Sequence, residues 1–368
     1  MGGGIVGCSI AFFLAKAGVR PLVLERAAVA AEASSGGAGL LSSQAHTDEA
    51  GPLFDLKLAS RALYPALADE LRDRTDMDIE YRQLGHVVPV FGDDDAKAVR
   101  ARIAWQAERG LSAQWLTAAQ TRELEPGLPA VVRGAGWFRD DHHINSTTMT
   151  QALASAVLRL GGQVRVECPV TDLVRDGRRI TCVRTARETI SAAEVVLAAG
   201  AWSGQFEAAA GIPLPIFPAK GQIVVARLPE PALRHVVYEA VYVIPRTLGE
   251  HIIGSTVEYV GFDKRTTVEG IAGLLGDATR LVPALRDAEM VASYGCLRPA
   301  SADGLPLLGR VPDRPGLVVA TGHFRNGILL APITGQLISE WIVSGRPSIS
   351  LEPFRPDRPF PPGFPPAG

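Results

Sequence analysis

Residues 1–26, MGGGIVGCSIAFFLAKAGVRPLVLER, join a glycine-rich turn to an apolar helix and then to a short apolar strand that ends in an acid. Gly2, Gly4 and Gly7 supply the pattern G-x-G-x-x-G. Such glycines let the backbone approach a pyrophosphate at a helix N-terminus, where unpaired N–H groups face the anion. Glu25 ends the next strand, where a carboxylate would bind an adenosine ribose and disfavour a 2′-phosphate. The stretch therefore predicts a Rossmann-type site for FAD or NAD, and argues against NADP.

The strand that should come before these glycines is absent. In a Rossmann unit the glycines follow a hydrophobic strand, and here only Met1 precedes them. That strand would lie in the middle of a parallel sheet, so each of its neighbours would lose a ladder partner. We expect the first Rossmann strand to be missing from this chain, through a late start site or a truncation, which would weaken stability and FAD retention.

The composition is that of an ordinary globular enzyme. The chain has 368 residues, of which 47% are hydrophobic and 21% charged, with a net charge of −2. This balance offers no basic field for nucleic acid. No uninterrupted apolar run reaches the roughly 20 residues of a membrane span, and no secretory signal is recognisable. Four widely spaced cysteines without a C-x-x-C pair indicate reduced thiols, so we predict a cytoplasmic location.

The order of helical and strand patterns predicts an α/β fold with two domains. Val195–Ala199 is a buried strand that opens onto a glycine, as expected at the carboxyl edge of a nucleotide-binding sheet. Residues 212–228 and 236–253 are rich in β-branched residues and predict antiparallel strands of another sheet. We assign residues 1–80, 141–207 and 293–358 to a Rossmann-like FAD-binding domain. Residues 81–140 and 208–292 form an α+β substrate-binding domain on an antiparallel sheet, and residues 359–368 form a Pro-rich tail.

Two further glycine-bearing segments are candidates for ligand contact. The loop after Glu25, AAVAAEASSGGAGLLSSQAH, is rich in small residues. It either touches the phosphates and ring of a dinucleotide or is a flexible surface loop, and the sequence does not decide between these. The second segment, Gly322–Gly327, precedes a helix over residues 328–343. Like the first turn, it places glycines at a helix N-terminus, where backbone N–H groups can face a ligand. Its expected ligand is the flavin end of the cofactor.

The run Asp140, Asp141, His142 and His143 contains residue types that bind metals. Adjacent residues on an extended chain point to opposite faces, and no third ligand lies nearby in the sequence. We therefore predict a solvated turn and no metal site.

Seven motifs together carry a resemblance to a known family. They are GGGIVG with Glu25, SSGGAGLL, AAGAWS, VYVIPR, GSTVEYVGFDK, GCLRPASADGLPLLGR and GHFRNGILLAPITG. In these motifs the chain resembles the D-amino-acid-oxidase-like flavoproteins, and among them the glycine oxidases of thiamine biosynthesis, from Gly2 to about Arg358. The resemblance implies FAD in the first domain, an antiparallel sheet roofing the flavin, and hydride transfer from the substrate α-carbon to flavin N5.

The same resemblance assigns three candidate catalytic residues. Arg298 in GCLRP matches the arginine that pairs with the substrate carboxylate, and Tyr242 in VYVIPR matches the tyrosine that helps to hold it. Arg325 in GHFRNG matches an arginine at the edge of flavin and substrate. A guanidinium can grip a carboxylate with two parallel hydrogen bonds, which lysine cannot do.

We also predict the residues that contact the cofactor. They are Gly2, Gly4, Gly7, Glu25, Arg26, Ser34, Ser35, Gly37, Ala38, Gly39, Leu41, Val170, Ala199, Gly200, Trp202, Gly322, His323, Arg325, Asn326, Gly327 and Ile328. Cys296 resembles the cysteine that holds flavin covalently in monomeric sarcosine oxidase. A buried thiol without a covalent bond is the favoured interpretation.

These assignments predict oxidative deamination of glycine or another small amino acid, such as sarcosine or a small D-amino acid. The products are a keto acid, ammonia and, with oxygen as acceptor, hydrogen peroxide. Ala240 and Val257 depart from the family pattern on the amine side, which leaves the preferred substrate open. Two alternatives remain: a D-amino-acid or hydrogen-cyanide-forming glycine dehydrogenase subunit with another electron acceptor, and a scaffold protein without FAD. Homo-oligomer formation is left open.

Overall fold

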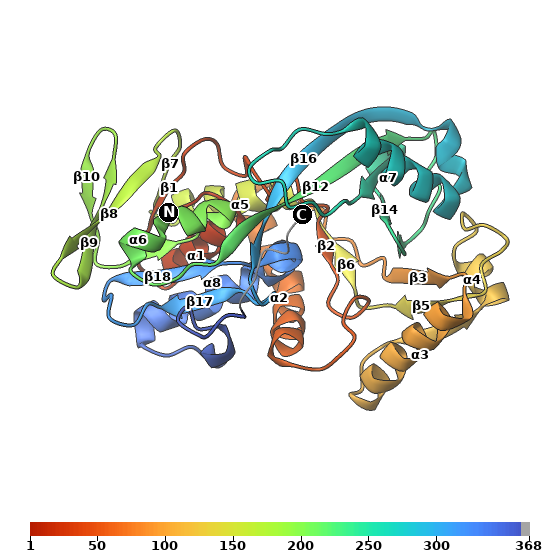
Figure 1. The fold of residues 1–368 in the computed structure, drawn as a ribbon, viewed down its shortest axis with the longest axis horizontal. Coiled ribbons are helices and arrows are strands. Elements are labelled where there is room, and N and C mark those ends of the chain that lie inside the picture. The colour runs from red at the N-terminus through yellow and green to blue at the C-terminus, as the bar shows by residue number, and fades with distance from the viewer. Residues whose placement is uncertain (362–368) are drawn as a thin grey trace.

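The computed structural model describes residues 1–361, so the end of the predicted Pro-rich tail, residues 362–368, lies outside the described residues. Figure 1 shows a helix-and-sheet body around α1 and α8 on the left and a large sheet on the right. The two long strands β12 and β16 run between them. The helices are α1 (Ile5–Lys16), α2 (Pro52–Thr75), α3 (Asp93–Glu108), α4 (Ala118–Leu124), α5 (Ser146–Arg159), α6 (Glu207–Ala210), α7 (Val268–Leu281) and α8 (Gly327–Ser344).

The parallel sheet of the predicted FAD-binding side consists of two pieces. β1 (Leu22–Leu24) pairs with β7 (Gln163–Arg165), and β11 (Val195–Leu197) pairs with β18 (Leu317–Thr321), both in parallel. β17 (Leu307–Arg310) adds to β18 in the antiparallel sense.

Met1 and Gly2 lie between the two pieces of this sheet. The N-terminal nitrogen of Met1 donates to the Val196 carbonyl at 2.9 Å, and Gly2 N donates to the Leu24 carbonyl at 2.8 Å. In the described residues no strand precedes α1, and these two residues occupy the place where the pattern predicts the absent strand.

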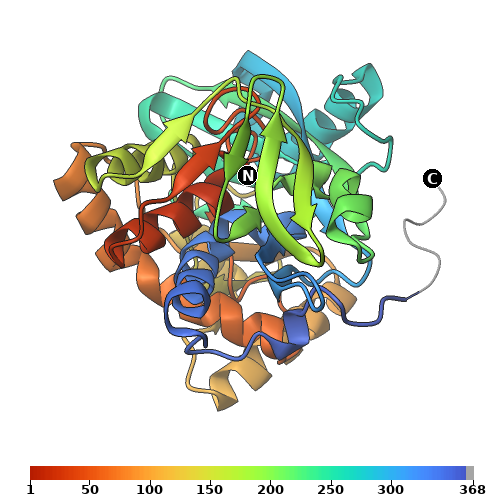
Figure 2. The same cartoon turned by 90° about the vertical axis from the view of Figure 1, so that its left-hand side faces the viewer.

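A small antiparallel sheet of β8 (Val170–Asp176), β9 (Arg179–Thr185) and β10 (Thr189–Ser191) projects from this side. In Figure 2 it faces the viewer.

The large sheet has eight strands and is mixed, which corrects the prediction of an antiparallel sheet. Its order is β16 (Glu289–Ser301), β12 (Ile216–Arg227), β15 (Glu250–Gly254), β14 (Tyr242–Pro245), β13 (Val236–Tyr238), β3 (His86–Val90), β5 (Gly134–Phe138) and β4 (Gln114–Thr117). Only the pair of β13 and β3 is parallel among the described strands of this sheet. These two strands come from distant chain segments, so no hairpin dictates that they run in opposite directions.

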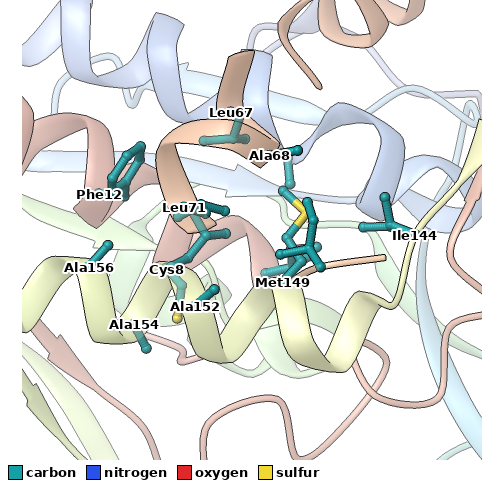
Figure 3. Packing of buried hydrophobic residues seen from close by; sticks show 14 of the residues in the cluster. Cys8, Phe12, Leu67, Ala68, Leu71, Ile144, Met149, Ala152, Ala154 and Ala156 are labelled. Carbon is teal, nitrogen blue, oxygen red and sulfur yellow. The ribbon is translucent and has the colours of Figure 1, made fainter. Parts of the chain in front are cut away.

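The core of the FAD-binding side is built around α1, which packs against α5 and α8. Figure 3 shows Cys8 and Phe12 of α1 among side chains of α2 and α5, such as Leu71 and Met149. All four of these residues are 0% exposed. The packing holds the N-terminus of α1 rigidly against the sheet edge.

One helix is apolar enough to raise the question of a membrane span. Among the described residues, Phe324–Ser344 could cross a membrane by length and composition alone. In this fold 56% of its 18-residue window is buried, and α8 packs on α1 and α2. The helix therefore has the surroundings of a core helix.

Candidate active site

A cavity of about 590 Å³ lies between the FAD-binding side and the large sheet. Its walls come from the N-terminus of α1, the loop after β1, the turn before α8 and strands β12, β14 and β16. This volume lies within the usual range for small-molecule sites. Every candidate catalytic residue, Arg298, Tyr242 and Arg325, lines it.

One end of the cavity is formed by the first turn of α1. Gly4 is the N-cap residue and the turn carries no acidic side chain, so its N–H groups, apart from that of Ile5, are available to an anion. Ser34 Oγ accepts the N–H of Ile5 at 2.8 Å and ties the glycine-rich loop to the helix. Gly2 has φ of +107°, and a Cβ there would lie 2.3 Å from the Ala198 carbonyl oxygen, so only glycine fits.

Glu25 lies beside this turn with its carboxylate facing the cavity. Its oxygens accept the N–H groups of Gly3 at 2.6 Å and of Ala27 at 2.9 Å. A carboxylate offers about four lone-pair positions, so acceptors remain for the hydroxyls of a ribose.

Aromatic and charged side chains cover the same end of the cavity. The Arg26 guanidinium lies 3.6 Å from the centre of the Trp202 ring and pairs with Glu32 at 2.7 Å. The ring centres of Phe262 and Trp202 lie 5.3 Å apart. Lys264 Nζ lies 3.1 Å from Glu32 Oε2. The loop between β15 and α7 thereby reaches across to the FAD-binding side.

The small-residue loop after Glu25 forms part of the cavity wall, through Ala33, Ser34, Gly36, Gly37, Ala38, Gly39 and Leu40. Ser146 Oγ donates to the Gly37 carbonyl at 3.0 Å, and Arg246 donates to the Ala38 carbonyl at 3.1 Å. The loop is thus hydrogen-bonded to two other segments and lies in the cavity wall, where it could contact a dinucleotide.

Asp141 corrects the prediction of a solvated turn. Its side chain is 0% exposed and accepts the backbone N–H groups of Ser43, Gln44 and Ala45 at 2.8–3.1 Å. The prediction failed because these donors lie far away in the sequence. Within residues 1–361 no cluster of three or more His, Cys, Asp or Glu could hold a metal ion.

The second glycine-bearing turn closes the other end of the cavity. His323, Phe324, Arg325, Asn326, Gly327 and Ile328 all line it. His323 is buried against Thr334, with 3.1 Å between Nε2 and Oγ1, and burial lowers its pKa to about 4. Arg325 is exposed and lies 5.4 Å from the Phe324 ring. This turn therefore places the neutral imidazole of His323 and the positively charged side chain of Arg325 in the cavity wall.

Arg298 and Tyr242 converge on one hydroxyl in the wall of the large sheet. Arg298 Nη2 donates to Ser255 Oγ at 2.6 Å, and Nη1 donates to the Thr256 carbonyl at 3.1 Å. Burial raises the pKa of Tyr242, while the Arg298 charge and a hydrogen bond with Ser255 oppose the rise only in part. The site thus offers a neutral phenol and a guanidinium with free N–H groups, which is a donor set for a carboxylate.

Comparison with known proteins identifies the family of the chain. The profile of the family DAO, described as FAD dependent oxidoreductase, matches residues 1–341. The chain belongs to this FAD-dependent oxidoreductase family.

Individual members of the family are similar over nearly the whole chain. A glycine oxidase of Geobacillus kaustophilus is 36% identical, with 96% of this chain and 94% of the relative covered. Its crystal structure superposes with a TM-score of 0.95 over 98% of both chains. A bifunctional protein ThiO/ThiG of Trichormus variabilis is 37% identical over 97% of this chain, which spans 54% of that longer protein.

FAD is the cofactor of this oxidoreductase family, and the residues present fit it. The helix N-terminus at Gly4 and the backbone at Gly2, which carries no side chain, would hold the pyrophosphate. The Glu25 carboxylate would accept hydrogen bonds from the ribose. The stacked pair of Arg26 and Trp202 offers a flat face at the same end. FAD bound here would supply a hydride acceptor for the substrate.

Cys296 of the oxidoreductase is a buried cavity-lining thiol. Burial raises its pKa, and Sγ donates to the Gly36 carbonyl at 3.4 Å. The protonated thiol is the form that this environment favours, in keeping with the prediction of a non-covalent role.

Most predicted cofactor residues line the cavity, and four do not. Gly7 packs under Gly2, Ser35 bonds the Glu32 carbonyl at 3.1 Å, Leu41 is fully buried in the core, and Gly322 packs against neighbouring strands. These four residues lie next to residues that line the cavity without lining it themselves.

Several cavity residues were missed in the sequence. They include His46, Lys57, Tyr238 and Ser255. The His46 and Tyr238 rings lie 3.6 Å apart, and Tyr238 packs edge-on against Tyr242 at 5.7 Å. His46 ends the small-residue loop and Ser255 stands in GSTVEYVGFDK, so both signals were present in segments already singled out.

Proposed function

We propose that this oxidoreductase converts glycine or another small amino acid, water and oxygen into the keto acid, ammonia and hydrogen peroxide. The observation that carries the proposal is the meeting of Arg298 and Tyr242 at Ser255 in the wall of the FAD cavity. Two such donors fit one carboxylate, and the cavity joins them to the nucleotide-binding end. The glycine oxidase relatives support the same substrate class.

The residues of the chain would act by binding and orienting the substrate. Arg298 presents its remaining N–H groups to the carboxylate, because Ser255 and Thr256 occupy only two of the five. Tyr242 stays protonated at neutral pH and adds a hydroxyl. An amino acid with a neutral amine needs no side-chain base, so the contribution of the protein is positioning. Arg325 would border the substrate from the turn before α8.

The proposal also covers the pathway, the location, the electron acceptor and the domain boundaries of the protein. The chain acts in thiamine biosynthesis, for which the ThiO/ThiG relative is the support. It resides in the cytoplasm, in line with its cysteine usage, and oxygen is the electron acceptor. Its domain boundaries are those given by the sequence, and homo-oligomer formation remains to be measured.

Anaerobic reduction of the flavin tests the function directly. The FAD-loaded protein is mixed with glycine, sarcosine, D-alanine or D-proline, and loss of flavin absorbance is followed. Reduction by glycine, and peroxide formation in air, support the oxidase. Turnover only with an artificial acceptor would replace it by the dehydrogenase, and a protein that stays colourless with excess FAD would contradict both.

A further inference from the structure

Arg298 is held by a short segment that follows strand β15. Ser255 Oγ accepts from Nη2 at 2.6 Å, and the Thr256 carbonyl accepts from Nη1 at 3.1 Å. Both terminal nitrogens of the guanidinium are therefore tied to this segment. Because the guanidinium is planar and rigid, the position of the segment sets the direction of its remaining N–H groups.

The segment is in turn held by two side chains outside the cavity. Gln222 N donates to Thr256 Oγ1 at 2.9 Å, and Gln222 Nε2 donates to Glu258 Oε1 at 2.8 Å. Thr256 Oγ1 donates to the same Glu258 oxygen. The Thr256 hydroxyl is thus hydrogen-bonded to both Gln222 and Glu258. Neither of these two residues lines the cavity.

Lys220 completes the arrangement beneath the segment. It is 2% exposed, and its Nζ lies 2.7 Å from Glu258 Oε2. The backbones of these two residues also exchange N–H···O bonds at 2.8 and 2.9 Å. Burial by itself would raise the pKa of Glu258, but hydrogen bonds from Lys220, Thr256 and Gln222 lower it, so the carboxylate stays charged.

Gly221, between Lys220 and Gln222 on β12, lies against Arg298. Successive residues of a strand point to opposite faces, so Lys220 and Gln222 share the face away from the guanidinium. A Cβ on Gly221 would lie 2.1 Å from Arg298 Nη2. The stretch 220–222 therefore leaves room for the guanidinium on one face and braces its supporting segment on the other.

We propose that Lys220, Gln222 and Glu258 are positioning residues for the substrate carboxylate, acting through Thr256 and Arg298. The inference rests on the proposed function, in which Arg298 binds that carboxylate. A purely structural ion pair would stabilise the sheet without affecting carboxylate binding. The positioning role makes carboxylate affinity depend on a charge pair that never touches the ligand.

The test uses acetate as a carboxylate probe and the visible absorbance of the FAD-loaded protein as the signal. Glu258→Gln and Lys220→Met should each raise the acetate Kd by about tenfold, the size of one charge-assisted hydrogen bond. The glycine KM should rise with it, kcat should change less, and FAD content should stay constant. Lys220→Arg, which keeps the cation, should restore most of the affinity. An unchanged acetate Kd in Glu258→Gln would overturn the proposal.

Two comparisons separate positioning from general stability. Glu250→Gln removes a 2.6 Å ion pair with Arg227, which joins β12 to β15, and should leave the acetate Kd unchanged. In an Arg298→Lys background, Glu258→Gln should shift the acetate Kd by less than about twofold, because the rigid guanidinium that Glu258 helps to orient is no longer present. An equal tenfold loss in both backgrounds would show a structural role and overturn the proposal. Arg298-dependent acetate binding without any glycine oxidation would contradict the proposed function and still support positioning.

Discussion

The buried carboxylate of Asp141 accepts the backbone N–H of Ser43 at 2.8 Å, although 98 positions separate the two residues. The same carboxylate accepts the N–H groups of Gln44 and Ala45, and His46 follows directly. Asp141 therefore fixes the end of the small-residue loop where His46 enters the cavity wall.

Asp141→Asn should lower the free energy of unfolding by about 3 kcal/mol, because an amide nitrogen would face buried N–H donors and leave them unsatisfied. Denaturant unfolding of the FAD-loaded protein measures this loss. Asp140→Asn is the matched control, since its side chain is 41% exposed and lies 3.9 Å from Arg61. Equal stability losses in the two variants would contradict the role of Asp141.

Arg298→Lys should raise the glycine KM by roughly 10- to 100-fold, because charge-assisted hydrogen bonds contribute about 1.5–3 kcal/mol each. FAD content should stay unchanged, since Arg298 lies with Tyr242 and away from the α1 turn. Steady-state kinetics and the flavin spectrum measure the two effects. Arg227→Lys, an exposed substitution on β12, serves as control. Unchanged kinetics would remove Arg298 from the site.

Tyr242→Phe should raise the glycine KM by about three- to tenfold, the value of one neutral hydrogen bond. Burial raises the Tyr242 pKa, so this hydroxyl does not titrate in the working range. Any rise of activity between pH 7 and 10 should therefore persist in the variant and follow the substrate amine. Loss of that rise would show that Tyr242 itself titrates. Tyr81→Phe, away from the cavity, is the control.

Lys264→Met should speed FAD release by about two- to fivefold, because a partly exposed ion pair contributes up to about 1 kcal/mol. The variant removes the 3.1 Å pair with Glu32 that joins the two sides at the Trp202 end. Stopped-flow release of FAD at low and high salt measures this, and high salt should erase the difference. Lys97→Met, an exposed pair with Asp94, is the control. Equal release rates at low salt would show that the pair does not retain FAD.

The oxidoreductase should lose stability as pH falls below about 6.5, the pKa of an unfolded histidine. Burial, and then the Arg246 charge, lowers the pKa of His143 to about 2. Between this pKa and about 6.5, His143 is therefore protonated in the unfolded state and neutral in the folded state. Each such histidine costs about 1.4 kcal/mol per pH unit over that window. His143→Gln should reduce the slope of unfolding free energy between pH 6 and 4 by one proton. Above pH 7.5 the two slopes should coincide, and an unchanged acid slope would contradict this account.

Local sequence patterns predicted much of the fold and of the cofactor site. The glycines of residues 2–7, the acid at Glu25 and the turn at residues 322–327 are short motifs whose backbone conformation follows from a few neighbouring residues. The family resemblance is confirmed by the match over residues 1–341, and most of the predicted contact residues line one cavity.

The prediction failed where distant residues decide the environment of a side chain. Asp141 looked solvated because its donors lie in residues 43–45. The parallel pairing of β13 with β3 and the ion pair of Lys220 with Glu258 likewise join segments that no short motif connects.

The amino-acid sequence alone predicted the Rossmann turn, FAD or NAD in preference to NADP and, through the family resemblance, the three candidate catalytic residues, since each prediction depends on a local backbone pattern or a motif. Only the tertiary structure decided that Asp141 is buried, that His46 and Tyr238 enter the site, and that Lys220 pairs with Glu258 beside Thr256. The physical reason is that burial and charge pairing depend on which distant segments pack together, which is a property of the assembled fold.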